Sequence, residues 1–275
     1  MTYQMLVSDL DGTIGNDAHQ ISEENKKAAK ALIESGVKLV LCSGRTPVSL
    51  EAILKEMQVN SSYIVGFNGC SVREVATNET IYEKKVSLET TKALIDEIKS
   101  FDVTIGVYVS ESVVFAQREK DLVDKVDAGG PLKFEVHEDL NSALTADIHK
   151  ILLIAPRPEL DKVYAYLADK IQGKCNMVFT NTTLLELIPL DGNKGKGLKF
   201  LAERLNMPLS AVVSCGDNYN DIELLQTAGM GIAVANAVEP LKKVADKITK
   251  STNNEHAFAE IVKFIIETNG GSYEI

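Results

Sequence analysis

The feature that most constrains the fold is a continuously apolar segment, VKLVLC at residues 37–42, set between two segments with helical spacing. A strand without a polar face must be covered on both sides, as strands of parallel sheets are. The preceding helix is expected to begin after Ser22, a good N-cap, and to stop at Gly36. The following one carries Pro47 in its first turn and is expected to run to about residue 57. These segments predict a parallel sheet with helices on both faces.

The same alternation surrounds this segment and returns late in the chain. Apolar segments at residues 4–8, 63–67, 211–215 and 231–235 are predicted as strands. Helices are expected over residues 195–205 and 221–228, with a closing helix around residues 258–265, and a hairpin around residues 77–79. Alternating strands and helices predict an α/β fold with a doubly wound, mostly parallel, Rossmann-like sheet.

The middle of the chain has a different pattern. Residues 103–109 alternate as a half-buried strand does and could pair with residues 112–117, and residues 177–180 and 184–188 suggest a second hairpin. Helices are expected over residues 88–101 and 159–171. We therefore expect a smaller α+β cap domain (86–189) inserted into a discontinuous core domain (1–85 and 190–275), with residues 191–193 as the return hinge.

Charge and composition exclude several classes of function. The net charge of −10 argues against binding nucleic acid or an anionic membrane surface. No apolar stretch approaches the ~18 residues of a membrane span, and the N-terminus lacks the pattern of a signal peptide, so a cytoplasmic location is expected. The four cysteines form no C-x-x-C pair and are expected to be reduced and buried, and the four scattered histidines receive no role. The oligomeric state stays open.

The strongest local motif directly follows the first predicted strand. Asp9 and Asp11 are two residues apart, so in an extended segment they point to the same side. They could flank one phosphoryl group, with Gly12 turning the chain away and Thr13 donating a hydrogen bond. Taken alone, such a pair could also be a turn or a helix cap.

Two more predicted strands end in polar loops. Residues 37–42 lead into Ser43, Gly44 and Arg45, which offer a hydroxyl, a flexible backbone and a cation. Residues 211–215 lead into a loop that carries Asp217, Asn220 and Asp221. Ligands of open α/β sheets bind outside the carboxyl ends of the strands, so the three loops should converge on one cleft.

Lys194 begins the helix expected after the insertion. A lysine there could neutralise phosphoryl oxygens beside the N–H groups of the helix start. The alternative is a solvated basic turn, and only the presence of the other motifs favours a phosphate-binding role for Lys194.

Phosphoryl transfer explains why these residue types occur together, because it needs positioning and neutralisation of charge. Mg²⁺ prefers a few hard oxygen ligands, which Asp9, Asp217 and a backbone carbonyl of the first loop could supply. Asp9 could then act as nucleophile. Asp11 would protonate the leaving alcohol and later activate water. We expect crowding by other carboxylates to raise the pKa of Asp11, with the metal opposing that rise.

The motifs together resemble the haloacid dehalogenase superfamily of phosphatases, specifically Cof-type members with an α+β (C2B-type) cap, over essentially the whole chain. The resemblance implies Asp9 as nucleophile, Asp11 as general acid/base, and Ser43 and Lys194 as phosphoryl clamps. It implies Mg²⁺ bound by Asp9, the Asp11 carbonyl and Asp217. The acidic loop would place Asn220 near the phosphoryl group and let Asp221 orient metal waters or Lys194.

Asn68 and Asn236 also resemble positions of this family that face the substrate, although either could simply form a turn. The chain departs from the family pattern at Ser8, where a bulky aromatic is usual, at Ala235, where glycine is common, and at residues 254–257. None of these removes a group that the chemistry needs.

The expected function is hydrolysis of small phosphomonoesters, sugar phosphates above all. A phosphomutase with the same covalent step is an alternative, and it would isomerise a hexose phosphate with little release of phosphate. A signalling module that accepts phosphate on aspartate is another. Receiver domains, however, are single small domains, whereas this chain has an insertion of about 100 residues suited to covering a cleft.

Overall fold

The computed structural model describes residues 2–109, 112–115 and 132–273. The chain divides into two compact units, and each is described by itself. Unit 1 comprises residues 1–83 and 193–275, and unit 2 comprises residues 84–192. In the sequence, unit 2 is therefore inserted between the two segments of unit 1.

Unit 1 is built on an eight-stranded sheet with the order β14-β13-β12-β1-β2-β3-β4-β5. The strands are β1 (Met5–Ser8), β2 (Lys38–Cys42), β3 (Tyr63–Gly66), β4 (Ser71–Glu74), β5 (Glu79–Glu83), β12 (Val212–Gly216), β13 (Met230–Ala233) and β14 (Lys247–Ile248). All neighbours from β14 to β3 are parallel, and β4 and β5 form the expected hairpin at one edge. The predicted doubly wound, mostly parallel sheet is confirmed.

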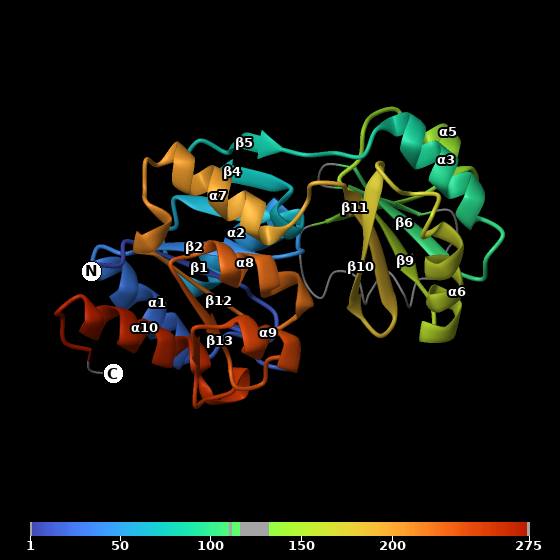
Figure 1. Ribbon diagram of the computed structural model, residues 1–275. Helices are drawn as coiled ribbons and strands as arrows, with labels where there is room; N and C mark the ends of the chain where they lie inside the picture. Colours follow the sequence, from blue (N-terminus) through green and yellow to red (C-terminus); the bar gives the residue numbers. More distant parts are fainter. Residues whose placement is uncertain (1, 110–111, 116–131, 274–275) are drawn as a thin grey trace. The chain divides into compact units, whose positions relative to one another are not determined.

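The connectivity makes β1 a topological switch point. The chain goes from β1 to β2 on one side, and it returns to β12 on the other side only after unit 2 (Figure 1). Leu6 lies opposite Leu39 on one side and opposite Val213 on the other. Because ligands of open α/β sheets bind at such a point, the loop after β1 is the place to look for a site.

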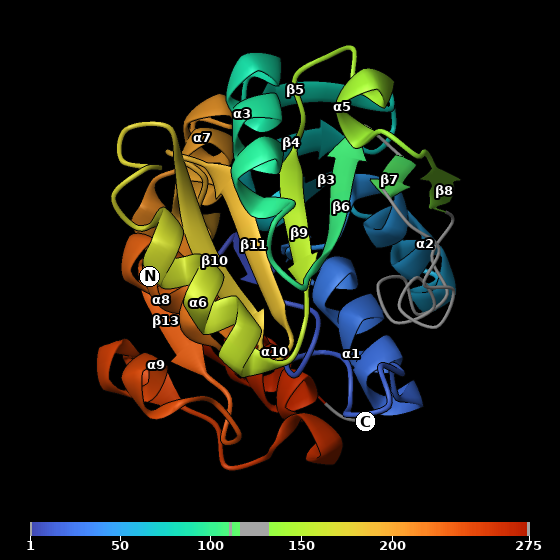
Figure 2. The same cartoon turned by 90° about the vertical axis from the view of Figure 1, so that its right-hand side faces the viewer.

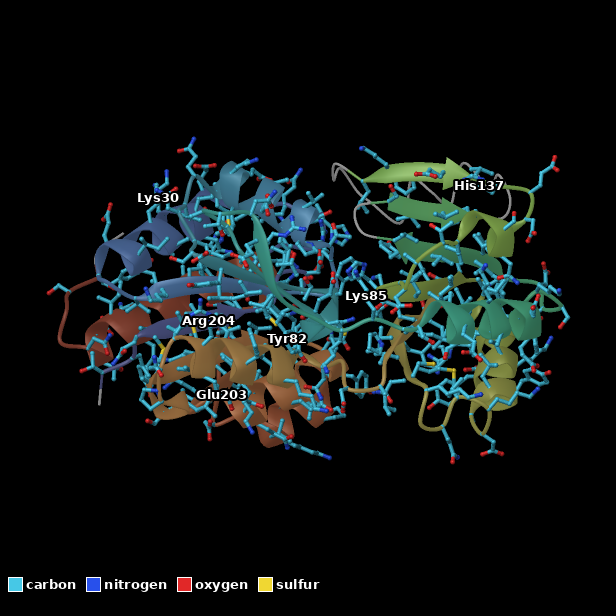
Figure 3. The ribbon with its side chains drawn as sticks, turned by 90° about the horizontal axis from the view of Figure 1, so that it is seen from above. Lys30, Tyr82, Lys85, His137, Glu203 and Arg204 are labelled. Carbon is cyan, nitrogen blue, oxygen red and sulfur yellow. The ribbon has the colours of Figure 1, made fainter. Side chains whose placement is uncertain are left out.

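Helices cover both faces of this sheet. They are α1 (Glu23–Glu34), α2 (Pro47–Met57), α7 (Lys194–Arg204), α8 (Ile222–Thr227), α9 (Glu239–Val244) and α10 (Ala257–Thr268). Leu6 packs into a buried cluster with α1, α2 and α10, whereas Met5 and Val7 pack on the other face with α7. α1 and α10 lie side by side (Figure 1), and Tyr82 of β5, labelled in Figure 3, packs on Phe200 of α7 with ring centroids 4.6 Å apart. The continuously apolar strands are therefore covered on both sides, as their composition requires.

Side-chain caps set where these helices begin. Ser22 Oγ accepts a hydrogen bond from Asn25 N at 3.2 Å, as expected for the N-cap of α1. Asn193 Oδ1 accepts one from Lys196 N at 2.8 Å. This cap starts α7 at Lys194, so that the lysine lies in the first turn.

Unit 2 has a six-stranded sheet with the order β10-β11-β9-β6-β7-β8. Its elements are α3 (Leu88–Ile98), β6 (Thr104–Val109), β7 (Ser112–Phe115), β8 (Lys133–Val136), α5 (Leu140–Ala143), β9 (Lys150–Ile154), α6 (Arg157–Leu167), β10 (Cys175–Asn181) and β11 (Leu184–Pro189). The helices α3 and α6 lie over one face of the sheet (Figure 2) and share its buried cluster. The predicted α+β pattern is confirmed.

Both hairpins expected in unit 2 are present, since β6 pairs with β7 and β10 with β11, each antiparallel. Of the predicted strand at 112–117, residues 116 and 117 lie outside the described residues. The sequence did not indicate β8, which runs parallel to β7, nor α5 and β9.

The cysteines are as predicted: Cys42, Cys70, Cys175 and Cys215 are all free and buried. Among the described residues no helix has the length and apolar character to span a membrane.

Candidate active site

Four neighbouring strands of unit 1 end in polar residues at one edge of the sheet. Asp9 follows β1, Ser43 follows β2, Asn68 follows β3 in the short helix η1 (Phe67–Gly69), and Asp217 follows β12. Asp9 N donates to Cys215 O at 3.0 Å, so the parallel pairing continues up to this aspartate. The loops predicted to converge do lie at the same edge.

Lys194 connects this edge to the first turn of α7. Its Nζ lies 2.5 Å from Asp9 Oδ1 and 2.5 Å from Asp221 Oδ1, and its side chain is fully buried. A buried ammonium is stable only when paired and hydrogen-bonded, as it is here. The alternative of a solvated basic turn is excluded.

Asp221 is held by donors on both oxygens. Besides the Lys194 contact on Oδ1, its Oδ2 accepts from Asp217 N and from Asn218 N, each at 3.0 Å. This carboxylate fixes the backbone of the acidic loop and the position of Lys194. It has less freedom than Asp9 or Asp217 to bind anything else.

Three carboxylates gather around the lysine. Oxygen atoms of Asp9, Asp217 and Asp221 all lie within 4.8 Å of one another. Burial raises the pKa of Asp9 well above its ordinary value; Lys194 lowers it, and the neighbouring carboxylates raise it further. Burial, followed by the charge of Asp221, raises the pKa of Asp217 to about 6, against hydrogen bonds and Lys194, which lower it. The cluster carries more negative charge than one lysine compensates.

These residues fit a divalent cation of the hard type. A carboxylate oxygen of Asp217 lies within 4.8 Å of one of Asp9, and a cation between them would offset the repulsion of two carboxylates held this close. Thr13 Oγ1 donates to Asp217 Oδ1 at 3.2 Å. Gly12 has φ +78°, and a Cβ there would lie 2.5 Å from Asp217 Oδ2. The donors are oxygens only, as Mg²⁺ prefers, and the glycine keeps open the space that they surround.

Asp11 has a different set of partners. Arg45 Nε donates to its Oδ2 at 2.8 Å and Arg45 Nη2 to its Oδ1 at 2.7 Å, and His19 Nδ1 lies 3.0 Å from Oδ1. Burial acts to raise the pKa of Asp11, but the hydrogen bonds and charge of Arg45, helped by His19, outweigh it and hold that pKa below its ordinary value. The expected rise is therefore wrong for this structure, because the sequence did not show that Arg45 pairs with Asp11.

The remaining predicted residues line the ends of β2 and β3. Ser43 Oγ accepts from Arg45 N at 3.3 Å, and Asn68 N donates to Ser43 O at 3.0 Å. Asn220 Nδ2 donates to Asn68 Oδ1 at 3.0 Å, and Gly44 packs against the Asn68 amide. The structure thus brings Ser43, Asn68 and Asn220 together.

A close backbone approach fixes Lys194 relative to Asn68. Gly69 has φ +90°, and a Cβ there would lie 2.0 Å from Asn193 O. The first turn of α7 can lie against the end of β3 only because this residue has no side chain.

Three contacts at the site were not anticipated. His19 had no assigned role. Ser8 Oγ donates to Asp9 O at 2.7 Å and accepts from Cys215 Sγ at 3.1 Å, so a small hydroxyl replaces the usual aromatic. Asn236, a possible substrate residue, instead donates to Gly12 O at 2.8 Å and accepts from Asn253 N at 2.8 Å. The sequence singled out Ser8 as a departure from the family pattern and Asn236 as a family-like position, but it gave no signal for His19.

Known proteins of similar sequence and fold are hydrolases and phosphatases. A solved haloacid dehalogenase-like hydrolase from Bacteroides thetaiotaomicron is 30% identical, with a TM-score of 0.89, over 96% of this chain and 100% of that one. The 5-amino-6-(5-phospho-D-ribitylamino)uracil phosphatase YitU of Bacillus subtilis is 26% identical, over 94% of this chain and 96% of its own. An HMP-PP phosphatase of Yersinia pseudotuberculosis is 27% identical, over 88% and 87%. The model of the haloacid dehalogenase-like hydrolase family matches residues 6–262, and the chain therefore belongs to that family.

Proposed function

We propose that this enzyme is a Mg²⁺-dependent phosphatase that hydrolyses small phosphomonoesters, with sugar phosphates as the expected class, through an aspartyl-phosphate on Asp9. One observation carries the proposal: Asp9, directly after the central strand, shares a buried lysine with Asp221, and one of its carboxylate oxygens lies within 4.8 Å of one of Asp217. A carboxylate in this setting has one oxygen held by Lys194 and two further carboxylates close by.

The phosphate would be bound by groups that neutralise its equatorial oxygens. Lys194 supplies the buried positive charge, and Ser43, with the backbone N–H groups near Gly44 and Gly12, supplies hydrogen-bond donors. Asn220 and Asn68 hold each other at the same edge of the sheet.

Mg²⁺ would be held by Asp9, Asp217 and the carbonyl of Asp11, and it would offset the repulsion between the carboxylates and the phosphate. Asp221 would act through Lys194 and through the backbone of residues 217–218, because both of its oxygens already accept hydrogen bonds.

The chemistry would proceed in two displacements. An oxygen of Asp9 attacks phosphorus, the bond from phosphorus to the ester oxygen breaks, and Asp11 gives its proton to the departing alkoxide. Asp11, now a carboxylate, takes a proton from water, which attacks the phosphoryl group and regenerates Asp9. Protonation of Asp11 must overcome the effect of Arg45, and the negative charge of an arriving phosphate favours it.

Unit 2 is proposed to set substrate specificity. The chemical groups named above all belong to unit 1, which leaves the 84–192 segment free to vary with the substrate. The two phosphatases named above differ in the compound after which each is named, although they resemble this chain over most of its length. A small-molecule phosphate is the common substrate class.

The test is a phosphate-release screen over sugar phosphates, nucleotides and vitamin phosphates with Mg²⁺, with Asp9→Asn as the blank. We expect turnover that both the substitution and a chelator abolish. Equal release by wild type and blank would contradict the proposal, as would full activity in chelator. Isomerisation of a hexose phosphate without free phosphate would indicate the mutase instead.

A further inference from the structure

The loop after the Asp-x-Asp motif turns back and brings a histidine onto Asp11. Asn16 closes this turn: its Oδ1 accepts from Ala18 N at 3.0 Å and from Gln20 N at 2.9 Å, and its backbone O accepts from His19 N at 2.8 Å. His19 itself has a left-handed backbone with φ 57°. The turn therefore fixes where the imidazole starts, and its Nδ1 reaches Asp11 Oδ1 at 3.0 Å.

Two asparagines from the far end of the chain brace the same loop. Asn254 Oδ1 accepts from Asp17 N at 3.1 Å, and Asn254 Nδ2 donates to Asp17 Oδ2 at 2.9 Å. Asn253 Nδ2 donates to Asp17 Oδ1 at 2.9 Å and to Gly15 O at 3.2 Å. Both carboxylate oxygens and the backbone N–H of Asp17 are therefore hydrogen-bonded, although the residue is exposed to solvent. A loop held at this point keeps His19 in place.

The contacts distinguish the two oxygens of Asp11. Oδ1 accepts from Arg45 and meets His19, whereas among the described residues the hydrogen bond to Oδ2 comes from Arg45 Nε. A carboxylate can only accept, so Nδ1 is the protonated nitrogen of the imidazole. Because Oδ1 already accepts from two donors, Oδ2 is the oxygen better able to carry the proton that Asp11 gives to the leaving oxygen.

We infer that His19, held by the Asp17–Asn254 contact, is a positioning residue for Asp11 that orients its carboxyl group for proton transfer to the leaving oxygen. The inference rests on the proposed function, in which Asp11 is the acid. His19 does not touch the reacting atoms and acts only through Asp11.

Leaving groups of different basicity separate this role from a merely structural one. An alkyl phosphate releases a strongly basic alkoxide that needs a proton, whereas p-nitrophenyl phosphate releases a stable phenolate that needs little help. kcat/KM includes the steps up to loss of the leaving group, so it reports the acid step without the later hydrolysis of the phosphoenzyme. Loss of positioning should lower kcat/KM for the alkyl phosphate alone.

The variants are His19→Gly, which removes the imidazole and suits the left-handed backbone, and His19→Asn, which keeps a donor and tolerates that backbone. We expect His19→Gly to lower kcat/KM about tenfold for glycerol phosphate or a hexose 6-phosphate, whichever the enzyme accepts, and less than about twofold for p-nitrophenyl phosphate. His19→Asn should recover most of the loss. Asn254→Ala should show the same selectivity with a smaller effect.

His137→Ala is the matched control, since His137 is also an exposed imidazole beside a carboxylate, with Nε2 3.4 Å from Glu135 Oε2 (Figure 3 labels it). We expect it to leave both substrates unaffected. In an Asp11→Asn background, His19→Gly should cause no further loss, because the two substitutions remove the same step.

The outcomes separate the two proposals. If Asp11→Asn itself shows no preference for the better leaving group, the acid role of Asp11 fails and the proposed function must be revised. If Asp11→Asn shows the preference and His19→Gly does not, the role of His19 is overturned. An equal loss for both substrates in His19→Gly, or an additional loss in the double variant, would also overturn it.

Discussion

Lys194 Nζ lies 2.5 Å from Asp221 Oδ1, and neither side chain is exposed. Removal of one partner from such a pair leaves a buried charge without compensation. We expect Lys194→Met to lower the free energy of unfolding by about 3–5 kcal/mol in urea titrations and to abolish phosphatase activity. Lys196 is exposed and lies two residues further along α7. Lys196→Met should change the free energy of unfolding by less than about 0.5 kcal/mol. Similar urea midpoints for Lys194→Met and Lys196→Met would show that the Lys194–Asp221 pair does not stabilise the fold.

Asp9→Asn should separate stability from activity. The ionised carboxylate of Asp9 is disfavoured by its surroundings, as its raised pKa indicates, so a neutral amide relieves repulsion with Asp217 and Asp221. In chelator at pH 7.5 we expect a Tm no lower than that of wild type, together with at least a ~10³-fold loss of activity. A markedly lower Tm would mean that the negative charge of Asp9 stabilises the metal-free fold.

The pH dependence of stability should reveal Asp217. Its pKa in the folded protein is about 6, above the ordinary 3.8, so the folded state binds the proton more tightly than the unfolded state. The stabilising contribution is complete below pH 3.8 and is lost as the pH rises through 6. In chelator, acidification from pH 7.5 to 5 should therefore increase the free energy of unfolding of wild type by roughly 1 kcal/mol relative to Asp217→Asn. Urea titrations at the two pH values measure this difference.

Mg²⁺ should reverse that trend, because the cation competes with the proton for the same carboxylates. The increase in Tm caused by Mg²⁺ should be larger at pH 7.5 than at pH 5. If Mg²⁺ raises the Tm of wild type and Asp217→Asn equally, Asp217 does not bind the cation.

Gly12→Ala should damage the metal site specifically. A methyl group there would lie 2.5 Å from Asp217 Oδ2, and the backbone is left-handed. Gly36→Ala is the matched control, since Gly36 has φ +86° but nothing within 4 Å of the added carbon. Backbone strain should lower the free energy of unfolding of both alanine variants by about 1 kcal/mol. Only Gly12→Ala should also weaken Mg²⁺ binding, measured by calorimetry, and equal Mg²⁺ affinities would contradict the crowding.

The sequence predicted what depends on local pattern and strand order. Residues 37–42 indicated a covered parallel strand, and the order of motifs placed Asp9, Ser43 and Asp217 at one edge of a sheet. These predictions succeed because parallel strands end together and because apolar periodicity reports burial directly. The helix expected after the insertion likewise put Lys194 at its start, although the cap on Asn193 that fixes this start was found only in the structure.

The contacts that the sequence could not predict join exposed loops far apart in the chain. Asp17 meets Asn254, 237 residues away, and no periodicity or charge pattern announces such a pair. The pairing of Arg45 with Asp11 was missed for a related reason: a guanidinium that fits a phosphate fits a carboxylate equally well. That ambiguity explains why the pKa of Asp11 was expected to move in the wrong direction.

The chain re-enters unit 1 at Asn193, immediately before the lysine that Asp9 and Asp221 share. This junction has a practical consequence for protein engineering. Replacement of residues 84–192 by a foreign segment would leave in the chain every group assigned to the chemistry, provided that the splice keeps Asn193. A junction drawn two residues later would remove the helix cap together with the only cation at the centre of the described carboxylate cluster.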